Sequence, residues 1–170
     1  MSDSLNDFAL AVYAADGVSG ACLTLQDRLD VDVNVVLFAA YLGAVRAESL
    51  SAAGLVAALD RVGDWHREVV QPLRSVRRRL KAHPAEAPTA TAAAQLRADV
   101  QRLEIDAEMV ELAELGALAA TGFQPVASGT AAERATEAMG TVVGDELDAE
   151  LRAAVGVIAS AAASWAARSA

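Results

Sequence analysis

Apolar residues recur at helical spacing along most of the chain, so the pattern predicts a series of amphipathic helices. The first begins after Ser4 and ends near Gly17, and a second covers residues 18–28. Asp30 or Asp32 is then expected to cap a third helix, because a carboxylate at that position accepts hydrogen bonds from the free amides of a helix N-terminus.

The predicted third helix is the most apolar part of the chain. Its sequence, VNVVLFAAYLGAV, is apolar on nearly every side, which predicts a central buried helix with Asn34 as its one strongly polar interior residue. Gln26 and Asn34 flank the turn that leads into this helix. Buried amides need hydrogen-bond partners, so we expect both side chains to join a buried polar network, with a ligand contact as the alternative.

The middle of the chain predicts a fourth helix, capped by Ser49 or Ser51. Pro72 either kinks this helix or opens a fifth one up to about residue 82, since a missing amide does little harm in a first helical turn. The proline-rich segment 83–90 is predicted to be a loop.

The rest of the chain predicts a long helix over about 91–120 and two alanine-rich helices within 130–168. The long helix has apolar residues on two faces, so we expect it to contact neighbours on two sides. Together the patterns predict a single all-α domain over residues 1–170, a compact bundle of about seven to eight helices with one long central helix. Composition agrees, because 54% hydrophobic residues with only 4% aromatic residues favour helices packed through small side chains.

Nothing in the sequence points to export or to a membrane. The N-terminal residues carry acids in place of the basic stretch of a secretory signal, and segment 153–167 is too short and weakly apolar to cross a bilayer. The single cysteine, Cys22, cannot form an internal disulfide, and a cysteine among apolar neighbours is usually a small core residue. We therefore expect a cytoplasmic protein with no membrane span.

The formal net charge of -9 argues against nucleic acid as a partner, because phosphate contacts need clustered cations. The charges are unevenly distributed along the chain, since seven of the 14 basic residues lie within residues 61–81, together with only two acidic residues. Four of these basic residues follow at i, i+3, i+4 and i+7 and form one stripe on the predicted fifth helix. We call this stripe the arginine face: Arg74, Arg77, Arg78 and Lys81.

Three interpretations of the arginine face are open. Guanidinium forks donate paired hydrogen bonds to carboxylates and phosphates, so the face could bind an anionic small molecule or an acidic protein partner. It could also be a solvated surface. The third interpretation is an internal one, because three glutamates at i, i+4 and i+7 on the long helix could pair with the arginines. These glutamates are Glu104, Glu108 and Glu111.

No motif assigns a catalytic residue. Helical dimetal sites usually pair Glu-x-x-His motifs from two helices, and none occurs here, so we predict neither a metal nor another cofactor. His66, beside Trp65, has no partner at helical spacing. A structural histidine is therefore favoured over a general base, because no nucleophile accompanies it.

Four ordered segments carry a resemblance to a known family. They are VYAADGVSGACLTLQD, DVNVVLF, VVQPLRSVRRRLK after Trp65, and LEIDAE, within about residues 8–115. On these segments, and above all on Leu-Gln-Asp, Asp-Val-Asn and Pro-Leu-Arg-x-x-Arg-Arg, the chain resembles an uncharacterised bacterial family of small helical proteins, described as conserved hypothetical proteins or a domain of unknown function. The resemblance implies no reaction, cofactor or partner, and the tail after Gly122 departs from the family pattern. The family-like positions are Gln26, Asp27, Asp32, Asn34, Trp65, Pro72, Arg74, Arg77, Arg78, Lys81, Glu104 and Glu108.

The leading hypothesis is a non-catalytic binding or interaction module that uses the arginine face together with Gln26 and Asn34. The alternative is a small enzyme or carrier for a phosphate- or carboxylate-bearing metabolite, in which Glu104, Glu108 or His66 handles protons. A deep pocket joining the arginine face to the long helix would favour the alternative, and a flat surface would count against it. The alanine-faced C-terminal helices leave a homodimer open.

Overall fold

The computed structural model describes residues 4–82, 85–86 and 88–169, and it confirms the predicted all-α fold. The body of the molecule begins with α1 (Leu5–Tyr13), α2 (Val18–Leu29) and α3 (Val33–Tyr41). A π-helical turn, η1 (Leu42–Arg46), continues α3. The helix α3 is buried at every residue from Asn34 onward, as its apolar sequence predicts.

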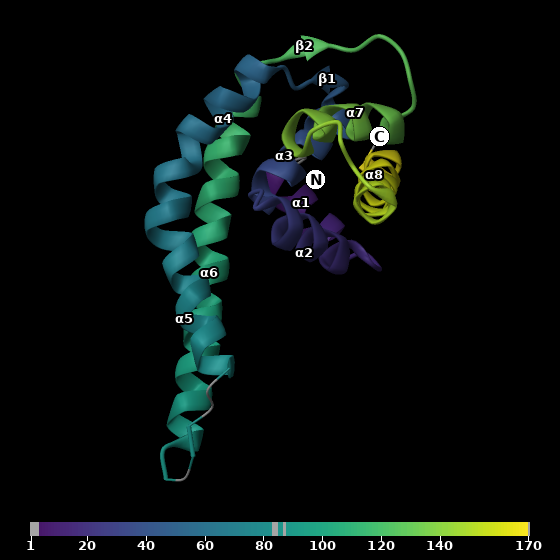
Figure 1. The fold of residues 1–170 in the computed structure, drawn as a ribbon. Helices are drawn as coiled ribbons and strands as arrows, with labels where there is room; N and C mark the ends of the chain where they lie inside the picture. Colours follow the sequence, from purple (N-terminus) through teal and green to yellow (C-terminus); the bar gives the residue numbers. More distant parts are fainter. Residues whose placement is uncertain (1–3, 83–84, 87, 170) are drawn as a thin grey trace.

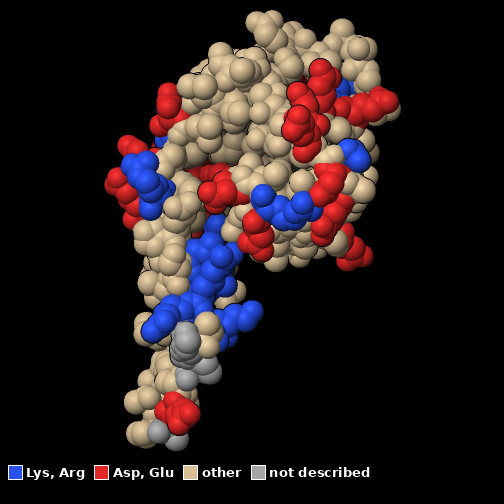
Figure 2. All heavy atoms as spheres, in the orientation of Figure 1, with Lys and Arg blue, Asp and Glu red and all other residues tan. Residues whose placement is uncertain are grey.

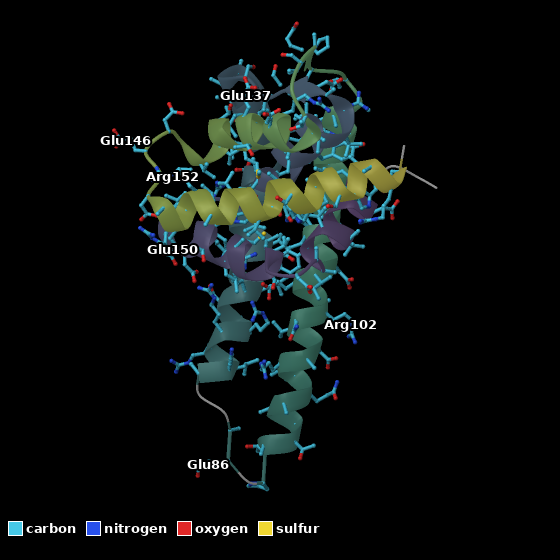
Figure 3. The ribbon with its side chains drawn as sticks, turned by 90° about the vertical axis from the view of Figure 1, so that its right-hand side faces the viewer. Glu86, Arg102, Glu137, Glu146, Glu150 and Arg152 are labelled. Carbon is cyan, nitrogen blue, oxygen red and sulfur yellow. The ribbon has the colours of Figure 1, made fainter. Side chains whose placement is uncertain are left out.

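A helical hairpin extends from the body and forms an arm (Figure 1). Its second limb is the long helix α6 (Ala90–Ala119), and Glu86 lies near the tip, far from the body (Figure 3). The predicted loop over residues 83–90 lies partly outside the described residues. The first limb consists of α4 (Ala52–Trp65), the π-helical turn η2 (His66–Val70) and α5 (Gln71–Ala82).

The first limb runs through Pro72 without ending there. In the π-helical turn, the amide of Gln71 donates to the carbonyl of His66, five residues earlier. Pro72 has no amide to donate. It follows this turn as the second residue of α5, where the missing donor removes few helical hydrogen bonds. The sequence left a kink or a new helix open, and the structure has a widened helical turn between two helices of one limb.

Helix caps settle two further alternatives. Asp32 caps α3 by accepting the amide of Asn34 at 2.9 Å, whereas Asp30 ends α2 in the left-handed backbone region, with φ of 54°. Ser51, rather than Ser49, caps α4 by accepting a backbone amide at 3.1 Å. Asp32 and Asn34 are therefore fixed together at the start of the buried helix α3.

Two C-terminal helices complete the body. They are α7 (Ala131–Val143) and α8 (Ala149–Ser169), and α8 lies across the body in Figure 3 and packs on α2 and α7. Both lie within the predicted range 130–168 or extend it by one residue. The helix α8 starts at Ala149 because the Asp148 carboxylate caps it by accepting the amide of Leu151 at 2.9 Å.

Two close contacts join the segment after α3 to the C-terminal part. The short strands β1 (Glu48–Ser49) and β2 (Gln124–Pro125) pair antiparallel, which the helical pattern did not predict. At Gly43, the backbone meets the backbone of Arg134 so closely that a Cβ on Gly43 would overlap the Arg134 carbonyl. The Arg134 Nε also donates to the Gly43 carbonyl oxygen at 3.0 Å.

The main apolar core fills the body and includes the parts of α4 and α6 that lie against it, but not the outer part of the arm. On α6, Leu96 and Leu103 are about half exposed, because the arm passes beyond the body there. The predicted contact of the long helix on two sides is therefore realised only in its C-terminal half. The largest apolar side chains of the core that are almost completely buried include Phe8, Leu25, Phe38, Met139 and Ile158.

Within the described residues, no helix is by itself long and apolar enough to cross a membrane. The helices α1 and α2 have the length and apolar composition of a membrane span only when they are taken together, and the chain bends by 99° between them.

Candidate functional site

The polar face of α6 points towards α5, η2 and the start of α3. Glu104 and Glu111 are buried, and Glu108 is partly buried beside them. Burial of a charged carboxylate is costly unless cations or hydrogen-bond donors satisfy it. The described residues supply these partners in two adjacent clusters, one built on arginines and one on a histidine.

The first cluster joins α5 to α6. Arg74 donates from Nε to Glu104 at 3.1 Å and from Nη2 to Glu108 at 2.7 Å. Arg77 forms a close ion pair with Glu104 through its Nε. Burial alone would raise the pKa of Glu104, but hydrogen bonds from Arg77 and Arg74 outweigh it and hold that pKa below its ordinary value. At Glu108, burial is the largest effect and raises the pKa.

The rest of the arginine face is more exposed. The contact from Arg78 Nη2 to Asp27 of α2 is long, at 3.5 Å, and the two side chains are 55% and 60% exposed. Lys81 lies exposed in the last turn of α5. Figure 2 shows basic residues gathered along the arm beside the underside of the body. The arginine face is therefore divided, with Arg74 and Arg77 in internal ion pairs and Arg78 and Lys81 towards solvent.

The second cluster brings Asp32, His66 and Glu111 together. His66 Nδ1 lies 3.0 Å from Glu111 Oε1 and 3.1 Å from Asp32 Oδ2. The Asn34 side-chain amide donates to Glu111 Oε2 at 2.6 Å. Of the two amides predicted to join a buried polar network, Asn34 therefore does so, and Gln26 is only partly buried. His66 has two acidic partners that its position in the sequence did not reveal.

The groups of this cluster shift one another's pKa values. Burial, with the charge of Glu111 next, raises the pKa of Asp32 to about 7. Burial would lower the pKa of His66, but the hydrogen bond to Glu111 and the charge of Asp32 outweigh it and raise that pKa. Burial would raise the pKa of Glu111, and hydrogen bonds from His66, Asp32 and Asn34 lower it instead. The shifts favour an ionised Glu111 beside a protonated His66.

A cavity of about 550 Å³ lies between the body and the arm, at the arginine cluster. Its lining comes from α1, α2, α3, α5 and α6. Leu10, Leu23 and Ile105 supply apolar wall and are each about half exposed. The predicted residues that line it are Gln26, Asn34, Arg74, Arg77, Arg78, Glu104 and Glu108. Of the other predicted site residues, Glu111 and His66 lie in the histidine cluster and Lys81 lies further along the arm.

The sequence pattern does not reveal the histidine cluster, because its members come from three separate elements. Asp32 is the cap of α3, His66 opens η2, and Glu111 lies on α6. The sequence marked Asp32 as a helix cap and as a family-like position, but not as a neighbour of His66. The one available signal was the burial predicted for Asn34, since a buried amide requires polar neighbours.

A family model described as "Protein of unknown function (DUF2390)" matches residues 4–115. The chain belongs to this family. The match confirms the resemblance found over residues 8–115, and it contains every residue of both clusters and of the cavity lining. In this DUF2390 protein, α7 and α8 lie beyond the matched region although they pack on α2 and α3. No curated protein and no solved structure matches the chain.

Proposed function

We propose that this DUF2390 protein binds a small molecule with an apolar body and one anionic group in the cavity between the body and the arm. The observation that carries the proposal is the shape and lining of that cavity. Its volume of about 550 Å³ lies in the range of small-molecule sites, and apolar walls meet a few converging polar groups there. A concave site favours the carrier hypothesis over a flat docking surface for an acidic protein.

Arg78 is the guanidinium best placed to hold the anionic group. Arg74 already donates from Nε and Nη2 to two glutamates, and Arg77 donates to Glu104. Arg78 has one long contact, to the exposed Asp27, and it lines the cavity. Most of its five donors can therefore turn to a carboxylate, sulfonate or phosphate oxygen.

The apolar part of the ligand would cover exposed hydrophobic wall. Leu10, Leu23 and Ile105 are between 46% and 54% exposed although they line a concave surface. Removing such surface from water is favourable in proportion to its area, at roughly 25 cal/mol per Å². Tyr13, which is 43% exposed at the same wall, adds an aromatic surface.

The charge of the lining restricts the class of anion. Three guanidinium groups face three carboxyl groups, those of Asp32, Glu104 and Glu108, so the cavity has no large positive excess. The carboxylates would repel a polyanion such as a nucleotide, and attraction by the three guanidinium groups would not offset that repulsion. A single anionic group on an apolar body fits this balance better.

The burial of Cys22, the one cysteine of the chain, favours binding over covalent chemistry in the cavity. Cys22 lines the cavity but is 1% exposed, and burial raises the pKa of its thiol to about 12. A protonated, buried thiol is a poor nucleophile at neutral pH.

The test uses 8-anilinonaphthalene-1-sulfonate, a fluorescent molecule with an apolar body and one sulfonate. We expect the dye to bind saturably at one equivalent and decanoate to compete with it. The affinity of Arg78→Ala for the dye should be at least about tenfold weaker, because a tenfold loss corresponds to one charge-assisted hydrogen bond. Arg79→Ala is the matched control, because Arg79 is exposed on the same helix outside the cavity. Equal dye affinity in Arg78→Ala and the control would overturn the proposal.

A further inference from the structure

We infer that Asp32, His66 and Glu111 form a binding site for one divalent transition-metal ion. The three side chains come from the cap of α3, the start of η2 and the middle of α6. One potential ligand atom from each lies within 4.8 Å of the others. This inference does not depend on the ligand proposed for the cavity.

The spacing of the donors matches a coordination sphere. Metal bonds to imidazole nitrogen and carboxylate oxygen are about 2.1 Å long, so two ligands at a right angle stand about 3.0 Å apart and at a tetrahedral angle about 3.4 Å apart. His66 Nδ1 stands 3.0 Å from Glu111 Oε1 and 3.1 Å from Asp32 Oδ2. An ion could therefore bind the three donors with little rearrangement of the backbone.

Asn34 orients both carboxylates. Its side-chain amide donates to Glu111 Oε2 at 2.6 Å, and its backbone amide donates to Asp32 Oδ1 at 2.9 Å. Each carboxylate thus uses one oxygen for Asn34 and presents the other to His66 Nδ1. Outer partners of this kind fix the direction of the carboxylates in metal sites.

Without a metal ion, hydrogen bonding holds this arrangement together only with a second proton, the one that Asp32 shares with Glu111. An imidazole nitrogen carries at most one proton, yet two carboxylate oxygens face the same Nδ1. A single N–H bond cannot point well at both. A divalent ion at the centre of the three donors would bind all of them at once, in place of these protons, and would balance the charge of the buried Glu111 and the partly buried Asp32.

The ligand set indicates the class of ion. One imidazole with two carboxylates suits Zn²⁺, Fe²⁺ or Mn²⁺, whereas Mg²⁺ and Ca²⁺ favour oxygen ligands only. Asp32 and Asn34 also line the cavity, which gives an ion a path to the site.

The first experiment uses the full chain, freed of metal by dialysis against a chelator and then titrated with Zn²⁺ or Co²⁺. The chain has two histidines, so NMR of the imidazole rings separates His66 from His83, which lies outside the described residues. We expect saturation at one equivalent, with shifted or broadened His66 ring resonances. Unchanged His66 resonances with either ion in excess would overturn the inference, whatever binds elsewhere.

Variants test the ligands one by one. Asp32→Asn keeps a residue that caps helices well but removes the carboxylate, so we expect a normal circular dichroism spectrum and at least tenfold weaker Zn²⁺ binding. His66→Ala should lose the binding. Glu114→Gln is the matched control, because Glu114 is an exposed carboxylate one turn along α6. Zn²⁺ affinity that is the same in Asp32→Asn, His66→Ala and the control would reject the site.

Discussion

Arg74 and Glu104 meet at 3.1 Å across the two limbs of the arm, although 30 residues separate them in the sequence. The same guanidinium reaches Glu108, one turn further along α6, so a single side chain bridges two turns of the opposite helix. The helix α5 buries no side chain completely. Ion pairs with α6 therefore fix the register of the hairpin in a place where apolar packing is thin.

Removal of Arg74 should destabilise the fold. Arg74→Ala leaves Glu104 buried with Arg77 as its remaining ion-pair partner, and breaking a buried pair from one side costs about 3–5 kcal/mol when no partner remains. Because Arg77 stays, we expect a loss of about 2 kcal/mol in the free energy of unfolding, measured by urea denaturation. Arg79→Ala, at an exposed site, should stay within about 0.5 kcal/mol of the parent. A loss as small as that of the control would mean that the arm does not depend on this ion pair.

The pKa of Glu104 makes part of the stability depend on pH. The folded state holds this pKa below the ordinary value of 4.5, because Arg74 and Arg77 favour the ionised form. The folded state therefore gains stability from Glu104 above pH 4.5 and loses it as the pH falls through the lowered pKa. Urea denaturation between pH 7 and pH 3 should show the parent's advantage over Glu104→Gln shrinking with acid. An advantage that stays constant over this range would contradict the prediction.

The amphipathic pattern was enough to predict the helices, and it offered the pairing of charges as one of three interpretations of the arginine face. The spacing of Glu104 and Glu108 on one face, opposite Arg74 and Arg77 on another, follows from 3.6 residues per turn and needs no tertiary information. Capping is also a local interaction, so the sequence narrowed the cap of α4 to Ser49 or Ser51, and the structure has Ser51.

The histidine cluster and the cavity could not be predicted in this way. Asp32, His66 and Glu111 are separated by 34 and 45 residues, and only the packing of three elements brings them together. The π-helical turn at His66 also shifts its face away from the period of the preceding helix. Tertiary contact, rather than local propensity, therefore creates the part of the molecule with the most unusual chemistry.

Gly43 provides a test of the packing between η1 and α7. Gly43→Ala would place a Cβ into the Arg134 carbonyl, and backbone on both sides leaves little room to relax. Overpacking of this kind costs typically 1–3 kcal/mol, so we expect a loss of at least about 2 kcal/mol in thermal or urea denaturation. Gly63→Ala is the matched control, since a Cβ there meets no atom within 4 Å. The control should be neutral or stabilised by up to about 1 kcal/mol, because alanine is the better helix former. Equal stabilities for the two variants would show that η1 and α7 can separate easily.

Cys22 reports on the wall of the cavity. Its thiol is 1% exposed, and burial raises its pKa to about 12, so little thiolate forms in the folded protein at pH 8. We expect 5,5′-dithiobis(2-nitrobenzoic acid) to modify the native chain very slowly and to modify one thiol per chain at once in guanidinium chloride. The rate in the folded state then measures how often α2 opens towards the cavity. A molecule bound in the cavity should slow this rate further in the parent but much less in Arg78→Ala at the same concentration, because that variant binds it more weakly. Rapid reaction of the folded, unliganded chain would contradict the burial of Cys22 and would indicate that the wall formed by α2 opens readily.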